Sequence, residues 1–228
     1  RIQDPAEPLN QMFVLLKADI LLHSQEGKDA WTYYSGVTGM PDMQIFAQAP
    51  VLSSPSTENF YQIFPQYADF AAQYGPGYAG YTFPQFEAFT VTERFPSTGS
   101  LSAYALGDEL LRATFTEDGR EGEGMFAASV VDFGSVPIAA GPPVGYQLPQ
   151  ADGGYYMAYN IMAVTAAKDT FVEWEGILTE SLGTLEYSEN FVNATIQAGQ
   201  EVVQQAMDFS RNANEVLNGI MSSWKARD

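Results

Sequence analysis

Proline spacing limits the fold of this 228-residue chain more than any other feature of its sequence. Seven prolines punctuate residues 36–98, at positions Pro41, Pro50, Pro55, Pro65, Pro76, Pro84 and Pro96. Proline lacks a backbone N–H and clashes with the preceding helical turn, so it interrupts long helices and central strands. Only short helical turns fit between these prolines, and we expect them at 58–64 and 67–74. Because the same stretch is rich in Tyr and Phe, its loops must pack onto apolar surface.

The first 35 residues predict a buried helix. Four apolar residues follow the spacing of three or four positions that a helix requires: Leu9, Phe13, Leu16 and Ile20. The opposite side is apolar as well, so we expect this helix to lie against the chain's own core or a partner subunit. Asp4 and Pro5 suit its start, and Gly27 suits its end.

Residues 36–150 predict a loop region with a small antiparallel β section. Two apolar segments, 110–116 and 125–131, flank a charged, glycine-rich connection. Within this connection, Asp118-Gly119 favours a hairpin turn because glycine tolerates the positive φ that such a turn needs. We therefore expect one antiparallel hairpin, followed by a connector rich in Gly and Pro over residues 141–154.

Residues 151–228 predict an antiparallel helical hairpin. A first helical stripe ends at Gly183 and consists of Met157, Ile161, Val164, Phe171, Trp174, Leu178 and Leu182. A second begins at the capping residue Ser188 and consists of Val192, Ile196, Val202, Val203, Ala206, Phe209, Ala213, Val216, Leu217, Ile220 and Trp224. The short link between them favours antiparallel neighbours. The whole chain is then a single α+β domain, with regions 1–35, 36–150 and 151–228.

The net charge of −18 restricts the partners of the chain. A surface this negative repels phosphate groups, so we expect no binding to nucleic acid or to anionic membranes. No run of 18 apolar residues occurs, so we also expect no membrane-spanning segment. The remaining partners are protein subunits, either copies of this chain or other components of an assembly.

Motifs for catalysis and for cofactor binding are missing from the sequence. His23 is the only histidine and cysteine is absent, which removes the usual Ser-His, Cys-His and zinc arrangements. We expect His23 in the last turn of the N-terminal helix, where a charged imidazole would interact favourably with the helix carbonyls. The run Gly75-Pro-Gly-Tyr-Ala-Gly80 has the spacing of a dinucleotide loop, but no parallel strand precedes it and no long helix follows. We therefore expect no catalytic residue and no cofactor.

Carboxylates leave two further possibilities. The pairs Asp108/Glu109 and Glu173/Glu175 permit a carboxylate-dependent hydrolase. The flexible connection of the hairpin could hold Ca²⁺ through four acidic residues: Glu117, Asp118, Glu121 and Glu123. Because the chain has 28 acidic residues, an exposed hairpin tip and ordinary solvated surface are the simpler interpretations.

Aromatic residues of the proline-rich region form the candidate interface. They are Tyr61, Phe64, Tyr67, Tyr74, Tyr78, Tyr81, Phe83 and Phe86. Tyr and Phe are enriched at protein interfaces, although packing within the chain's own core would use the same residues.

These features favour a non-enzymatic structural subunit of a larger extracellular or viral assembly, such as a filament, a pilus-associated component or a virion. The absence of cysteine, together with a start at Arg1 that suggests processing, favours an extracellular, periplasmic or particle-associated location. Two alternatives remain. One is a secreted or periplasmic binding module with an aromatic glycan- or peptide-binding surface around residues 74–89 and 155–159. The other is the carboxylate-dependent hydrolase.

Overall fold

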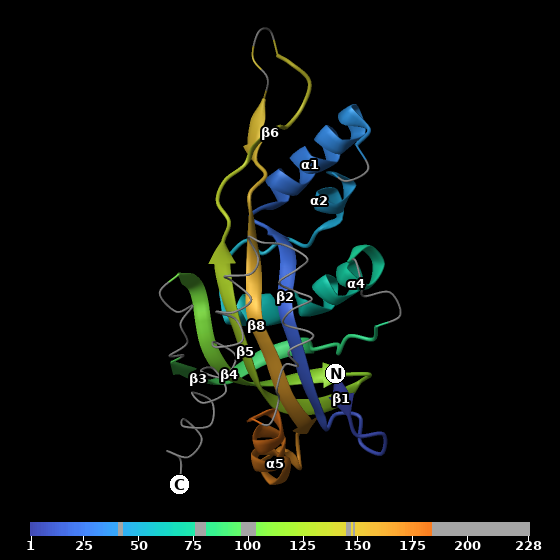
Figure 1. Cartoon of the computed structure of the whole chain (residues 1–228), viewed down its shortest axis with the longest axis vertical. Helices are drawn as coiled ribbons and strands as arrows, with labels where there is room; N and C mark the ends of the chain where they lie inside the picture. The colour runs from blue at the N-terminus through green and yellow to red at the C-terminus, as the bar shows by residue number, and fades with distance from the viewer. Residues whose placement is uncertain (41–42, 76–80, 97–103, 145–146, 148, 184–228) are drawn as a thin grey trace, which may run out of the picture.

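A six-stranded antiparallel sheet organises the chain (Figure 1). The computed structural model describes residues 1–40, 43–75, 81–96, 104–144, 147 and 149–183. Across the sheet the strands follow the order β1-β2-β8-β5-β4-β3. Their bounds are β1 (Ile2–Gln3), β2 (Gln11–Leu22), β3 (Glu87–Pro96), β4 (Ala105–Glu117), β5 (Arg120–Asp132) and β8 (Tyr155–Ala167).

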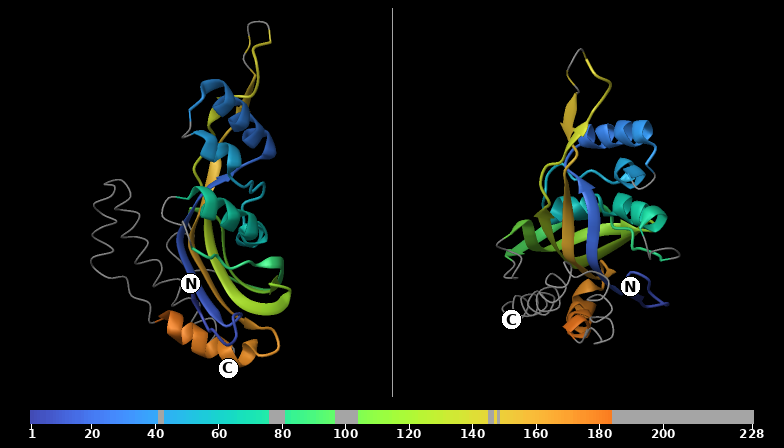
Figure 2. Two further views of the ribbon diagram at one scale, coloured as in Figure 1. Left: turned by 90° about the vertical axis from the view of Figure 1, so that its right-hand side faces the viewer. Right: turned by 45° about the horizontal axis from the view of Figure 1, so that its top comes forward.

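Five helices and a second, two-stranded sheet complete the described part of the chain. The helices are α1 (Gln25–Thr38), α2 (Gln44–Gln48), α3 (Thr57–Gln62), α4 (Phe64–Tyr74) and α5 (Phe171–Gly183). The small sheet pairs β6 (Pro137–Ala139) with β7 (Gln150–Asp152). Figures 1 and 2 show that β6 and β7 project beyond one end of the large sheet, next to α1, while α5 lies at the opposite end.

Apolar side chains form two separate clusters on the two faces of the sheet. Neighbouring residues on one strand point to opposite faces. Accordingly, Phe126 and Ile161 belong to a large aromatic cluster with α3 and α4, while Ala127 and Met162 belong to a smaller cluster with Phe171 of α5. The central strands β5 and β8 are therefore buried on both faces where these helices cover them.

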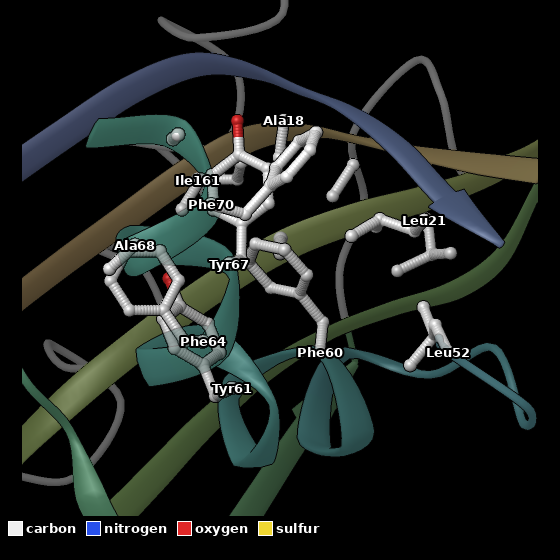
Figure 3. Packing of buried hydrophobic residues seen from close by; sticks show 14 of the residues in the cluster. Ala18, Leu21, Leu52, Phe60, Tyr61, Phe64, Tyr67, Ala68, Phe70 and Ile161 are labelled. Carbon is white, nitrogen blue, oxygen red and sulfur yellow. The ribbon is translucent and has the colours of Figure 1, made fainter. Parts of the chain in front are cut away.

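The larger cluster is built mainly from aromatic rings. Figure 3 shows Phe60, Phe64 and Tyr67 of α3 and α4 gathered with Ala18 and Ile161 of the sheet. Most of the ring pairs in this cluster meet edge to face or at a tilt, the arrangement that the quadrupoles of aromatic rings favour.

The predicted N-terminal helix is wrong, because residues 11–22 form strand β2. The central part of this strand contacts apolar residues on both faces, so its sequence reads as a continuous apolar run rather than as an alternation. A β-bulge between Ala18 and Leu21 then places two core residues three positions apart, which imitates helical spacing.

The predicted C-terminal helical hairpin is also wrong, because most of its first helix is strand β8. Asn160 has a φ of 52° beside an irregularity in the pairing with β5, and the core-facing residues on either side of it are Ala158 and Ile161. Their spacing of three again resembles a helix. Only the end of the predicted stripe, from Phe171, is helical, and it forms α5. The predicted second helix, from Ser188 onward, lies outside the described residues.

The hairpin and the short helices of the middle region are confirmed. Strands β4 and β5 pair around Asp118-Gly119, whose φ angles are 52° and 74°. Helix α3 lies between Pro55 and Pro65, and α4 begins before the expected 67–74 and contains Pro65 in its first turn, where proline is tolerated. The β section is not small, however, because β2, β8 and β3 extend this hairpin into the large sheet. Within the described part of the chain, no helix is both long and apolar enough to cross a membrane.

Candidate functional site

Residues 133–151, which we call the arm, leave the sheet between β5 and β8 and return to it. The two sides of the arm pair as β6 and β7, with Ile138 opposite Ala151. Figure 1 shows the described residues of the arm extending past α1. We call residues 141–148 the tip of the arm; those that the structure describes, 141–144 and 147, lie away from the sheet and from its aromatic core.

The arm carries no charged side chain. It is the longest stretch of the sequence without Asp, Glu, Lys or Arg, in a chain whose net charge is −18. Asp132 and Asp152 stand immediately before and after it. The uncharged run thus coincides with the projecting part of the structure.

The lower half of the arm packs against α1. Ile138 and Ala151 are buried there, and the indole N–H of Trp31 donates to the carbonyl of Gly153 at 2.8 Å. A Cβ at Gly153 would lie 2.7 Å from the Trp31 indole nitrogen, so this close approach requires glycine. These contacts fix the direction in which the arm leaves the body.

Among the described residues at the end of the arm, most are exposed and several are joined by backbone hydrogen bonds. The amides of Val144 and Gln147 donate to each other's carbonyls at 2.8 and 3.2 Å, and the amide of Ala140 donates to the carbonyl of Pro149 at 2.8 Å. Pro142 and Pro143 are exposed, and Val144 exposes 73% of its surface. The apolar residues 142–144 are thus exposed to water next to these hydrogen bonds.

His23 joins the two ends of the arm. Its Nδ1 lies 3.0 Å from Asp152 Oδ2, and its Nε2 lies 3.1 Å from Asp132 Oδ1. Each ring nitrogen therefore faces one carboxylate, and which nitrogen donates depends on the tautomer. We call these three side chains the clasp. His23 follows strand β2, so its predicted place in the last turn of a helix is wrong.

The clasp is not arranged for catalysis by its histidine. Both ring nitrogens are engaged by carboxylates, so neither is free to take a proton from a nucleophile. The hydroxyl of Ser135 donates to Asp152 at 3.2 Å and not to the ring. This geometry differs from a Ser-His-Asp triad, in which the ring contacts the hydroxyl directly.

Asp152 also shapes the local backbone of the arm. Its Oδ1 accepts from the amides of Val136 and Gly154 at 3.0 and 2.8 Å. Burial acts to raise the pKa of Asp152, but the hydrogen bonds from His23, these two amides and Ser135 outweigh it and lower the pKa below its ordinary value. The ionised carboxylate is thus the form that holds the base of the arm.

The aromatic residues predicted as an interface lie mostly inside the protein. Five of them are buried in the large cluster: Tyr61, Phe64, Tyr67, Phe83 and Phe86. Tyr74 and Tyr81 are 38% and 36% exposed, and Tyr78 lies outside the described residues. Packing within the chain accounts for the buried five, and a role in partner contacts stays a prediction.

The four acidic residues predicted as a possible calcium site do not converge. Glu117 is buried and accepts from Arg1 and Gln11, each at 2.7 Å. Glu121 pairs with Lys168, Glu123 pairs with Arg112, and Asp118 forms the hairpin turn. Among the described residues, no three acidic or histidine side chains are arranged to hold a metal ion.

The carboxylate pairs predicted for a hydrolase are also separated. Asp108 and Glu109 are neighbours on β4 and so point to opposite faces of the sheet. The hydroxyl of Ser129 donates to Asp108 at 2.8 Å, and Arg94 donates to Glu109 at 3.0 Å. Glu173 and Glu175 lie on α5, two positions apart, and therefore on different sides of it.

The sequence prediction missed the arm, which it treated as a connector. The signal that could have found it is the long uncharged run bounded by two aspartates in an otherwise acidic chain. No protein-family model, no curated protein and no solved structure matches this chain.

Proposed function

We propose that this chain is a non-enzymatic subunit that joins a larger assembly through the tip of its arm. The observation that carries the proposal is an exposed, uncharged and apolar tip on a protein with a net charge of −18. Isolated apolar residues are common on protein surfaces and need no explanation. A continuous projecting segment without any charged residue, in contrast, is typical of an interaction site.

Charge explains why the tip suits a contact with another protein. The centres of protein interfaces are depleted of charged residues, because each charge buried there must lose its water. Elsewhere the acidic surface repels other acidic chains over a distance of about 8 Å in physiological salt. The tip extends beyond the body, so a partner can contact it with little of this repulsion.

The base of the arm lowers the cost of binding. The clasp, the Trp31 hydrogen bond and the packing of Ile138 hold the arm in one direction before any partner arrives. Less conformational entropy is then lost when the tip is immobilised, so more of the contact energy appears as affinity.

The edges of the large sheet are less suited to assembly. Strand β1 pairs only with Gln11 and Met12, so the rest of β2 is an edge. There the bulge after Ala18 interrupts the row of backbone groups that another strand would need, and Lys17 adds a charge beside it. The edge strand β3 has two irregularities of its own and carries Glu93, Arg94 and Pro96. Charges, bulges and proline are the features by which natural proteins prevent pairing between sheet edges.

The partner is then a protein, and the proposed setting is an extracellular, periplasmic or particle-borne assembly. A photo-crosslinking residue at position 144 tests the role of the tip, and the same residue at position 37 is the control. Val37 is 67% exposed on α1 and lies off the arm. Adducts from this position therefore measure the background of contacts that do not involve the tip.

We expect crosslinking in the native source to give one adduct of defined mass from position 144, at least fivefold more abundant than any adduct from position 37. Electron microscopy and mass determination of the same material should show the adduct in an ordered complex. A chain that stays monomeric, or that crosslinks equally from both positions, would contradict the proposal.

A further inference from the structure

The three side chains of the clasp come from three separate elements at the base of the arm. His23 follows β2, Asp132 ends β5 and Asp152 ends β7. The side chain of His23 is 13% exposed, whereas those of Asp132 and Asp152 are 45% and 41% exposed. Because the enclosed ring contacts one carboxylate at each end of the arm, a change in the ring acts on both ends at once.

The protons on the ring decide how many hydrogen bonds the clasp can make. Both nitrogens of an imidazole donate when the ring is protonated, and such bonds to carboxylates are among the strong ones. A neutral imidazole has one N–H, so its other nitrogen places a lone pair against a carboxylate oxygen. In the clasp these two acceptors would lie only 3.0 or 3.1 Å apart, which is unfavourable. The loss of one ring proton therefore removes one of the two bonds.

Carboxylates dominate the surroundings of the ring. Besides Asp132 and Asp152, the ring of Tyr156 on β8 lies 4.2 Å away, measured between ring centroids. Burial raises the pKa of Tyr156, and the negative charges of Asp132 and Asp152 raise it further. Helix α1 begins directly after the ring and has Glu26 in its first turn, followed by Lys28, whose ammonium group donates to the carbonyl of Gln48. The start of a helix disfavours a nearby positive charge, but the two carboxylates are in direct contact with the ring.

The two ends of the arm differ in how firmly they are held without the ring. Asp152 also accepts from the amides of Val136 and Gly154, at 3.0 and 2.8 Å. Asp132 accepts from the amide of Gly134 at 2.7 Å, through the same oxygen that faces the ring. The end of the arm at Asp132 therefore depends more on the ring than the end at Asp152.

We propose that the clasp is a pH-sensitive switch that holds both ends of the arm while His23 carries two ring protons and releases the Asp132 end when the ring loses one. Histidine suits this role because its ordinary titration falls between about pH 5 and 8. The bond to Asp132 contributes to the closed arm on the acid side of this titration and is lost as the pH rises through it. The switch acts on the base of the arm, whatever the tip contacts.

A titration of the purified protein from about pH 5 to 9 tests the switch. His23 is the only histidine, so the ¹⁵N signals of its ring report its protons directly in nuclear magnetic resonance spectra. Amide hydrogen exchange, corrected for the intrinsic rate, is measured on the same samples. The pKa of Asp152 is lowered from 3.8 and that of Tyr156 is raised from 10.0, so neither group titrates in this range.

The amide of Gly134 is the reporter, because its hydrogen bond to Asp132 holds the released end. We expect its exchange to become about fivefold faster as the ring loses its proton, with the same midpoint as the ring signals. The amide of Phe60, which donates to Ser56 in the body, should change less than twofold. Constant exchange at Gly134 through the titration of the ring would overturn the proposal, as would a ring whose protonation does not change between pH 5 and 9.

Two variants separate the switch from a general effect of pH. In His23→Gln, exchange at Gly134 should be fast at every pH and should show no step, because the amide side chain does not titrate. Tyr156→Phe is the matched control, since it keeps His23 and the ring packed against it, so the step should remain. A step that persists in His23→Gln, or that disappears in Tyr156→Phe, would overturn the proposal.

Discussion

The body and the arm use apolar residues in opposite ways. In the body, Phe60, Tyr61 and Phe64 are completely buried, and the ring of Phe60 contacts the rings of the other two. In the arm, Val144 is 73% exposed and its neighbours Pro142 and Pro143 are exposed as well. The body satisfies its apolar surface within one chain, while the tip of the arm does not.

This difference separates stability from function. Burial of apolar surface stabilises the fold by about 25 cal/mol per Å², so a change in the body should act on unfolding. A change at the tip removes little buried surface and should act on binding alone. The changes that follow test this separation, beginning with the largest expected effect.

Tyr61 is the residue of the body whose loss should cost most. Its ring is fully buried, and its hydroxyl lies 2.8 Å from the carbonyls of both Ala127 and Met162 on neighbouring strands. We expect Tyr61→Ala to lower the free energy of unfolding by about 4 kcal/mol, because it leaves a cavity and removes the one hydroxyl donor that the two carbonyls share. Thermal denaturation should show a fall in Tm of roughly 10 °C.

The matched variant Tyr61→Phe separates the two causes. It keeps the ring and removes only the hydroxyl, so we expect a loss of about 1 to 3 kcal/mol. If Tyr61→Ala and Tyr61→Phe destabilise equally, the aromatic packing contributes nothing and the description of the body is wrong.

The clasp should affect the arm and leave the body nearly unchanged. In His23→Gln, one amide nitrogen cannot reach both Asp132 and Asp152, so one end of the arm loses its hydrogen bond. These carboxylates are partly exposed, so we expect a local loss of about 1 kcal/mol. Hydrogen exchange should become faster at the amides of Val136 and Ala140, which the fold of the arm protects.

The readout on the body is the control for His23→Gln. The Tm of this variant should stay within about 2 °C of the original value. A fall as large as that of Tyr61→Ala would show that the clasp belongs to the core of the fold and not to the arm.

Acid should produce the smallest effect at the arm, and Glu7, whose pKa is also lowered by its hydrogen bond from Arg120, should respond separately. The pKa of Asp152 in the folded protein is lowered from its ordinary value of 3.8, so its contribution to stability is present above pH 3.8 and is lost as the pH falls through the lower, folded value. Amide exchange at Val136 and Gly154, corrected for the intrinsic rate, should increase in this range. In Asp152→Asn this increase should disappear.

The sequence predicted local features better than the arrangement of strands. The Asp118-Gly119 turn and the two short helices of the proline-rich region follow from backbone chemistry that acts within a few residues. Strands β2 and β8 were predicted as helices, because burial on two faces hides the alternation and bulges at Ala18 and Asn160 change its period. Both causes depend on contacts between distant segments, which periodicity along the chain does not record.

The candidate site was harder to predict than the fold. Residues 133–151 contain Gly and Pro, so they resemble an ordinary connector, and their projection depends on β5 and β8 pairing as neighbours. The clasp joins His23 to residues more than one hundred positions away in sequence. The missing charge of the arm is visible in the sequence, but it indicates an interface only once the arm is known to project.

Removal of the tip tests the separation of body and arm most directly. Replacing residues 141–148 with Asn-Gly joins β6 to β7 by a short turn and leaves Trp31, Ile138 and the clasp in place. Thermal denaturation is then measured on the purified variant, and its association with the assembly is measured by sedimentation of material from the native source. We predict a Tm within about 3 °C of the original value and a loss of association of at least tenfold. A large fall in Tm, or association that is unchanged, would contradict this account.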